Sequence, residues 1–82
     1  MQHDKINKLT LLLLYLNSWE EKEYGQLIHR AWKGHDFGTL DKLEEEGFIA
    51  NSKTTKSLYL TEEGIEEAKR LEKLILSVMD YK

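Results

Sequence analysis

The chain has 82 residues and a formal net charge of −3, with 33% charged and 40% hydrophobic residues. It contains no cysteine, which excludes disulfides, thiolate catalysis and cysteine-bound zinc. A chain of this length forms one small domain, and we interpret residues 1–82 as a single domain. The apolar run Leu9–Leu16 is far shorter than the roughly 20 residues that span a bilayer. We therefore expect no membrane partner and a cytoplasmic location.

The first predicted helix covers residues 5–17. Four apolar residues recur at helical spacing along one face of it: Ile6, Leu9, Leu13 and Leu16. Further apolar residues lie on its other sides: Leu11, Leu12, Leu14 and Tyr15. A helix that is apolar nearly all round is buried on more than one side. This helix is therefore expected either at the centre of the domain or against a second subunit.

A second helix is predicted over residues 24–32, after a polar segment that is interpreted as a connection. Its apolar residues recur at helical spacing: Leu27, Ile28, Ala31 and Trp32. Gly34 suits the left-handed position that ends a helix. Trp32 is accordingly expected in the core, whereas Trp19, in the polar connection, is expected to be exposed and to suit a protein contact.

A third helix is predicted over residues 37–46, with Phe37 facing inward. Asp36 suits the N-cap position before this helix. Gly47 suits its end, because glycine adopts a positive φ without steric cost. The third helix should therefore follow the second after a short turn.

A β-hairpin and a long last helix complete the predicted elements. The hairpin covers residues 48–61, where two short extended runs flank a polar tip. Thr61 is expected to cap the last helix, over residues 62–80, whose first turn carries Glu62 and Glu63. Such a helix is roughly 27 Å long at 1.5 Å per residue, longer than a body this small needs to cover.

The order of these elements is that of a winged helix-turn-helix. We therefore predict a mainly α fold with a small β-hairpin: a winged helix-turn-helix with a long C-terminal helix.

Three segments resemble a family of small, uncharacterised bacterial winged-helix proteins: RAWKGHDF (30–37), LDKLEEEGFI (40–49) and SLYLTEEG (57–64). The similarity extends from about Leu11 to Leu71. The segments Phe37–Ile49 and Leu60–Leu71 are more distantly similar to PadR-like and MarR-like winged-helix regulators. The resemblance implies the winged-helix fold, and no residue role is carried over from it.

DNA binding is the leading functional hypothesis. In a winged helix the third helix enters the major groove and the wing contacts the DNA backbone or the minor groove. The candidate DNA-binding residues are Arg30, Lys33, His35, Thr39, Lys42, Lys53 and Lys56. Asp41 opposes phosphate binding, whereas Glu44–Glu46 lie at the C-terminal end of the helix, which points away from DNA in this docking mode. The charges also fit an ordinary solvated surface. We predict a small transcription-regulator-like protein that binds double-stranded DNA.

The alternative is a winged-helix module that binds a protein partner and does not bind DNA. The acidity of the chain favours this alternative, because a domain held to DNA mainly by charge is usually basic.

We also predict a homodimer. The surplus apolar residues of the first and last helices are the candidate interface residues: Leu11, Leu14, Leu71, Leu74, Ile75, Val78 and Met79. A small domain gains stability by burying such residues against a second copy. Packing within the monomer is the other explanation.

No catalytic or metal site is predicted. The chain has no glycine-rich phosphate loop and no recognisable pairing of a nucleophile with a base. The spacing of His29, His35 and Asp36 matches no metal-ligand pattern, so these are expected to be surface residues. We therefore predict no cofactor and no enzymatic activity.

Overall fold

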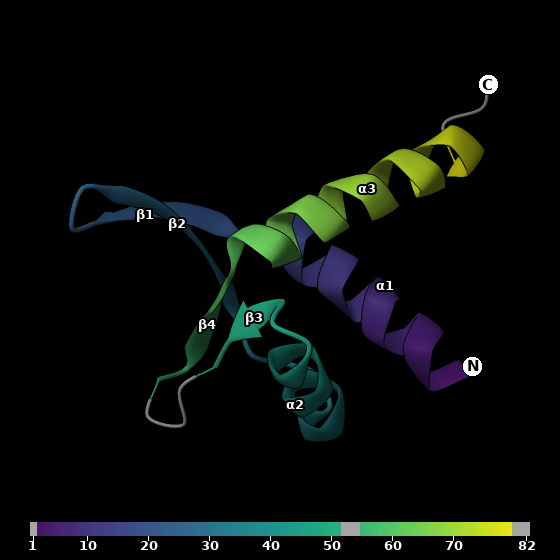
Figure 1. The fold of residues 1–82 in the computed structure, drawn as a ribbon, viewed down its shortest axis with the longest axis horizontal. Coiled ribbons are helices and arrows are strands. Elements are labelled where there is room, and N and C mark those ends of the chain that lie inside the picture. Colours follow the sequence, from purple (N-terminus) through teal and green to yellow (C-terminus); the bar gives the residue numbers. More distant parts are fainter. Residues whose placement is uncertain (1, 52–54, 80–82) are drawn as a thin grey trace.

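The computed structural model describes residues 2–51 and 55–79 (Figure 1). In these two ranges the elements are α1 (Gln2–Leu16), β1 (Trp19–Glu23), β2 (Gln26–Trp32), α2 (Phe37–Glu45), β3 (Ile49–Ala50), β4 (Ser57–Leu60) and α3 (Glu62–Met79). The four strands form one antiparallel sheet in the order β1-β2-β4-β3. The domain is therefore of the α+β class.

The predicted helix-turn-helix is wrong. Residues 19–32, expected to form a connection and a helix, instead form the β1–β2 hairpin, which projects from the body of the domain (Figure 1). Its two-residue loop consists of Tyr24 and Gly25, which have positive φ angles of 52° and 77°. Two successive positive φ values are typical of the type I′ turn, which matches the twist of paired strands. The fold is thus not a mainly α winged helix.

The apolar residues of β2 fit both a helical and an extended period. In the strand, Ala31 points into the core and is 1% exposed, whereas its neighbour Trp32 points outward and is 64% exposed. Alternation of this kind is the property of a strand with one covered face. Gly34 follows this strand rather than a helix, and it does not have the positive φ expected of it.

The C-terminal half has elements where the sequence predicts them, but its hairpin differs in role from a wing. Strands β3 and β4 pair with each other, with Ile49 opposite Leu60. However, β4 also pairs with β2, with Leu58 opposite Ala31. The hairpin is therefore half of a continuous sheet.

The predicted caps at Asp36, Gly47 and Thr61 are confirmed. The Asp36 carboxylate accepts a hydrogen bond from the Thr39 backbone N–H at 3.1 Å at the start of α2. Gly47 ends this helix with a φ of 83°, and the Phe48 N–H donates to the Leu43 carbonyl at 3.0 Å. This is the hydrogen bond of a Schellman motif. At the start of α3, the Thr61 hydroxyl accepts from the Gly64 N–H at 3.0 Å.

The core lies between the helices and one face of the sheet. Its buried residues come from all three helices and from β2, β3 and β4: Leu11, Leu14, Ala31, Leu40, Leu43, Ile49, Leu58, Leu60 and Ala68. Residues directly opposite one another in a sheet lie on the same face. The register therefore places Arg30, Tyr59 and Ala50 together on the other face, which we call the open face.

Candidate functional site

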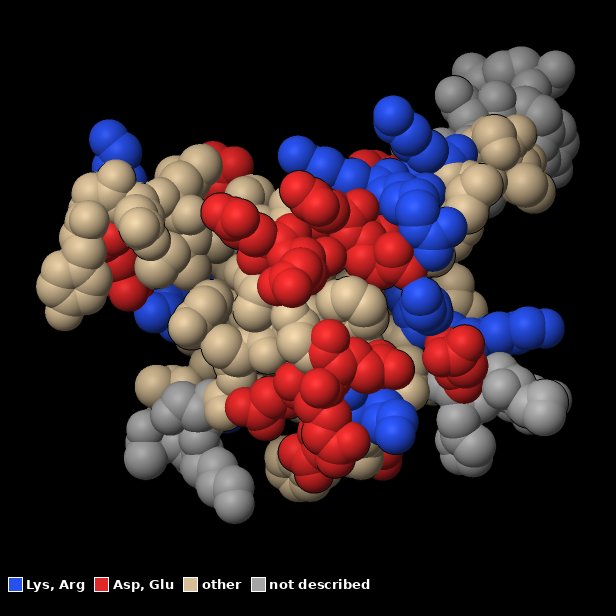
Figure 2. Space-filling model, viewed as in Figure 1, with Lys and Arg blue, Asp and Glu red and all other residues tan. Residues whose placement is uncertain are grey.

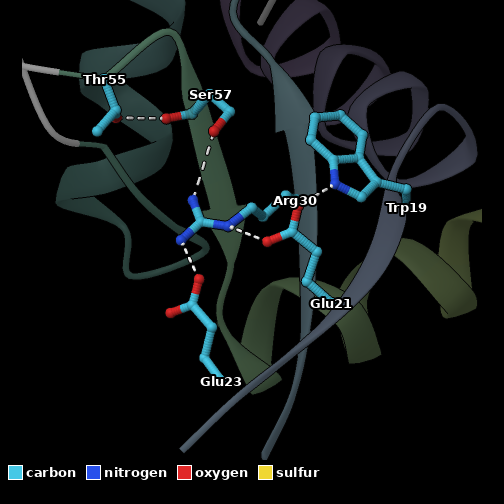
Figure 3. A network of polar contacts seen from close by, with 6 residues as sticks. All are labelled: Trp19, Glu21, Glu23, Arg30, Thr55 and Ser57. Atoms are coloured by element: carbon cyan, nitrogen blue, oxygen red, sulfur yellow. Dashed lines mark hydrogen bonds and ion pairs between the residues drawn. The ribbon is translucent and has the colours of Figure 1, made fainter.

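The open face of the sheet carries aromatic, charged and polar side chains from three strands (Figure 3). Strand β1 contributes Trp19, Glu21 and Glu23 by alternation, and Arg30 of β2 is opposite Trp19 in the register. The sequence does not predict this face, because residues 24–32 are predicted to form a helix rather than part of a sheet.

Arg30 is held on the open face by two carboxylates. Its Nη2 donates to Glu23 Oε2 at 2.6 Å, and its Nε lies 3.2 Å from Glu21 Oε1 (Figure 3). The hydrogen bond to Glu23 is the main cause that raises the pKa of Arg30 above its usual value. Since the charge of Arg30 is balanced within the domain, this residue is poorly placed to bind phosphate.

A shallow depression of about 530 Å³ lies where β2 leads into α2, beside the start of β4. We call it the basic–aromatic depression. Its lining residues are Trp32, Lys33, Gly34, His35, Phe37 and Lys56. The backbone N–H of Lys33 donates to the Lys56 carbonyl at 3.1 Å, which fixes the two basic segments side by side. Trp32 is 64% exposed and Phe37 is 78% exposed.

Trp32 is supported from one side by Trp19. The two ring centroids are 4.9 Å apart and the ring planes are tilted by 43°. The Trp19 indole N–H in turn donates to Glu21 Oε2 at 2.7 Å (Figure 3). The contacts therefore restrict the Trp32 ring while leaving most of its surface open to a ligand. The expectation that Trp32 lies in the core is wrong, and Phe37 does not face inward.

The structure separates the DNA-binding candidates into groups. Lys33, His35 and Lys56 meet in the basic–aromatic depression. Thr39 and Lys42 line a different depression, which also includes Asn7 of α1. Arg30 lies in the ion pairs described above, and Lys53 lies outside the described residues.

Acidic groups occupy much of the surface seen in Figure 2. They gather over the first turns of α3 and around the end of α2, where Glu44–Glu46 are exposed. Basic side chains gather along the middle of α3 and beside α1. A surface dominated by carboxylates repels phosphate, so this view does not present a nucleic-acid-binding face.

The candidate dimer residues also fall into separate environments. Leu11 and Leu14 belong to the core of the single chain. Leu74 and Val78 are exposed on α3, which extends beyond the body of the domain (Figure 1). Leu71 and Ile75 are half-buried on the same helix. Met79 ends α3, and its side chain lies outside what the structure describes.

Within residues 2–51 and 55–79, no three histidine, aspartate or glutamate side chains gather in a way that could hold a metal ion. Across the same residues, no helix is long and apolar enough to cross a membrane.

The fold defines a small α+β domain, in which helices cover one face of a four-stranded antiparallel sheet and the other face carries exposed aromatic residues. The chain belongs to the family described as a domain of unknown function, DUF6429, which matches residues 2–77.

A relative in this class is the uncharacterized protein y4hR of Sinorhizobium fredii. It is 38% identical over 72 residues, which cover 87% of this chain and 88% of the relative. No solved structure matches the chain. These findings support the resemblance to a small, uncharacterised bacterial family.

Proposed function

We propose that this protein binds single-stranded DNA through the basic–aromatic depression. The observation that carries the proposal is the presence of two largely exposed aromatic rings, Trp32 and Phe37, beside the basic side chains of Lys33, His35 and Lys56. Proteins that bind single strands combine base stacking on aromatic rings with cations that contact the phosphates.

The preorganisation of Trp32 supports this proposal. The Trp32 ring is already restricted by its contact with Trp19 and by its place in a paired strand. Less conformational entropy is therefore lost when a base stacks on this ring. Phe37 is the first residue of α2 and directly follows Asp36, the N-cap residue of this helix. Both rings are therefore mounted on regular elements rather than on a loop.

A single strand suits this geometry better than the double-stranded DNA expected from the sequence. Reading of the major groove needs a helix that enters the groove with base-contacting residues. Asp41 and Glu44–Glu46 are exposed along α2 and at its end, and their negative charges oppose the approach of a duplex. An unpaired base, in contrast, can stack on the exposed rings of Trp32 and Phe37 without any helix entering a groove.

The net charge of −3 predicts that binding is weak, and the small number of phosphate contacts makes its salt dependence shallow. Each phosphate contact on a single strand contributes a slope of roughly −0.7 in a plot of log affinity against log salt. The depression has two described lysines, Lys33 and Lys56. They supply at most about two such contacts, so the slope should be no steeper than about −1.4.

The experiment is a fluorescence anisotropy titration of a labelled oligothymidylate of about 12 nucleotides, a length that fills one small binding domain. We expect Trp32→Ala and Phe37→Ala each to weaken binding about tenfold, because stacking contributes about 1–3 kcal/mol per base. Tyr24→Ala is the matched control, since Tyr24 is a fully exposed aromatic at the tip of the β1–β2 hairpin.

Two outcomes would contradict the proposal. One is that the oligothymidylate does not bind even at low salt. The other is that a duplex binds at least as tightly as the single strand and the two alanine variants bind it like the wild type.

A protein-binding module is the second candidate function. Exposed aromatic residues such as Trp32 also form the energetic centres of protein interfaces, and α1 has an exposed apolar face that no nucleic acid would cover. The homodimer expected from the sequence is one form of this function. Self-association without any affinity for the oligothymidylate would favour this candidate.

A further inference from the structure

Helix α1 has two apolar faces, and among the residues that the structure describes only one of them packs into the core. The buried face carries Leu11 and Leu14 in the core. On the opposite side four aliphatic residues are 47–55% exposed: Ile6, Leu9, Leu13 and Leu16. We call these four residues the α1 stripe. An uncharged row of large aliphatic side chains on the surface of a small domain marks an interaction site.

The spacing of the α1 stripe is that of a coiled-coil seam. The intervals between its members are three, four and three residues, which are the a and d positions of two heptads. The same intervals are obtained when the helix is read backwards. In an antiparallel pair, Ile6 therefore faces the partner's Leu16, and Leu9 faces the partner's Leu13.

We propose that two copies of this chain associate through an antiparallel pairing of their α1 stripes about a two-fold axis. A two-fold interface requires a patch that is complementary to itself. The α1 stripe meets this requirement because its symmetric spacing gives the same residue pairs at both ends of the two-helix contact. The proposal does not depend on the basic–aromatic depression, since the two share no residue.

Charges at the ends of the stripe complement one another in this arrangement. The exposed Lys5 borders the stripe near the start of α1, and the last turn of α1 has no basic residue. An antiparallel pair brings Lys5 of each chain to the C-terminal turn of the partner's α1. A cation is favourable there, because the helix dipole gives that end a partial negative charge. Thr10 and Asn17, which also flank the stripe, are uncharged, so no like charges oppose one another.

Sedimentation equilibrium across a concentration series tests the association. We expect the wild type to approach twice the chain mass of 9.7 kDa. The double variant Leu9→Glu/Leu13→Glu should dissociate about a hundredfold more readily, since it places unpaired charges in the seam. Leu27→Glu is the matched control, because Leu27 is 56% exposed but lies on β2. Circular dichroism checks that each variant is folded.

Disulfide trapping tests the orientation, and the absence of native cysteine makes it clean. A mixture of Leu9→Cys and Leu13→Cys chains should form cross-linked dimers faster than either variant alone. Cross-linking of Leu9→Cys mainly with itself would overturn the antiparallel arrangement. A wild-type chain that stays monomeric at high micromolar concentration, or a double variant that dimerises like the Leu27→Glu control, would overturn the proposal.

Discussion

The ammonium group of Lys8 in α1 lies 2.6 Å from the carboxylate of Glu67 in α3, and this ion pair joins the first and last helices through residues 59 positions apart in sequence. Glu67 also accepts two hydrogen bonds from Arg70, at 2.7 and 2.9 Å. Hydrogen bonding by Arg70 and then by Lys8 lowers the pKa of Glu67 from 4.5 to about 2.

The first prediction concerns acid stability. Because the pKa of Glu67 is lower in the folded chain than in the unfolded chain, its ionised form stabilises the fold. This contribution is fully present above pH 4.5 and is lost as the pH falls towards about 2. We expect Glu67→Gln to lower the free energy of unfolding by about 1 kcal/mol at pH 7. Urea denaturation at several pH values should show this difference shrinking below pH 4.5.

The control for this prediction is Glu66→Gln, which removes the same charge from an exposed neighbouring position on α3. It should change stability little at any pH. A difference between wild type and Glu67→Gln that persists unchanged at pH 2 would show that the ion pair is not its origin.

The second prediction concerns the close approach of α3 to the backbone after α2. A methyl group at Gly64 would overlap the carbonyl oxygen of Phe48, which also accepts the Thr61 N–H at 3.0 Å. We expect Gly64→Ala to destabilise the domain by about 3 kcal/mol, since the backbone must move to admit the side chain. In thermal denaturation, Gly34→Ala should be nearly neutral because nothing lies within 4 Å of its added Cβ. Equal stability of the two variants would contradict this packing.

The residues that cap α2 and α3 show which parts of the fold are predictable from sequence. Asp36, Gly47 and Thr61 act through hydrogen bonds to residues within a few positions, so their roles are encoded locally. The β1–β2 hairpin is different. Ile28 and Trp32 are one helical turn apart as well as on the same face of a strand, so the period alone does not decide between the two structures.

The candidate site could not be predicted for the same reason. Lys33, His35 and Lys56 could be chosen by charge alone, but the exposure of Trp32 depends on the strand. Its contact with Trp19 depends on the register of β1 against β2. The one local signal of that hairpin is Tyr24-Gly25, with glycine at the second position of a two-residue loop.

The third prediction uses this loop. Tyr24 has a φ of 52°, which is uncommon for an aromatic residue and more readily adopted by asparagine. Tyr24→Asn creates an Asn-Gly loop, the preferred sequence of a type I′ turn. We expect it to stabilise the domain by about 0.5 kcal/mol, whereas Gly25→Val should destabilise it by at least about 1 kcal/mol. Chemical denaturation of both variants measures the effect, and a destabilised Tyr24→Asn chain would contradict the turn type.

The last prediction links Arg30 to the proposed binding of single-stranded DNA. The carboxylate of Glu23 accepts the 2.6 Å hydrogen bond from Arg30, and Glu21 supplies a second negative charge. Glu23→Gln removes one of these charges and leaves the guanidinium of Arg30 only partly neutralised on the open face. We therefore expect Glu23→Gln to tighten binding of the oligothymidylate several-fold at low salt and to steepen the salt dependence.

The matched control is Glu46→Gln, which removes one negative charge from the exposed end of α2. Because long-range charge effects are screened beyond about 10 Å at 0.1 M salt, its effect should be smaller than that of Glu23→Gln and should vanish first as salt is added. If both variants gained affinity equally at every salt concentration, net charge alone would explain the gain, and the bound oligothymidylate would not pass near Arg30. A gain specific to Glu23→Gln would extend the binding surface from Trp32 along β2.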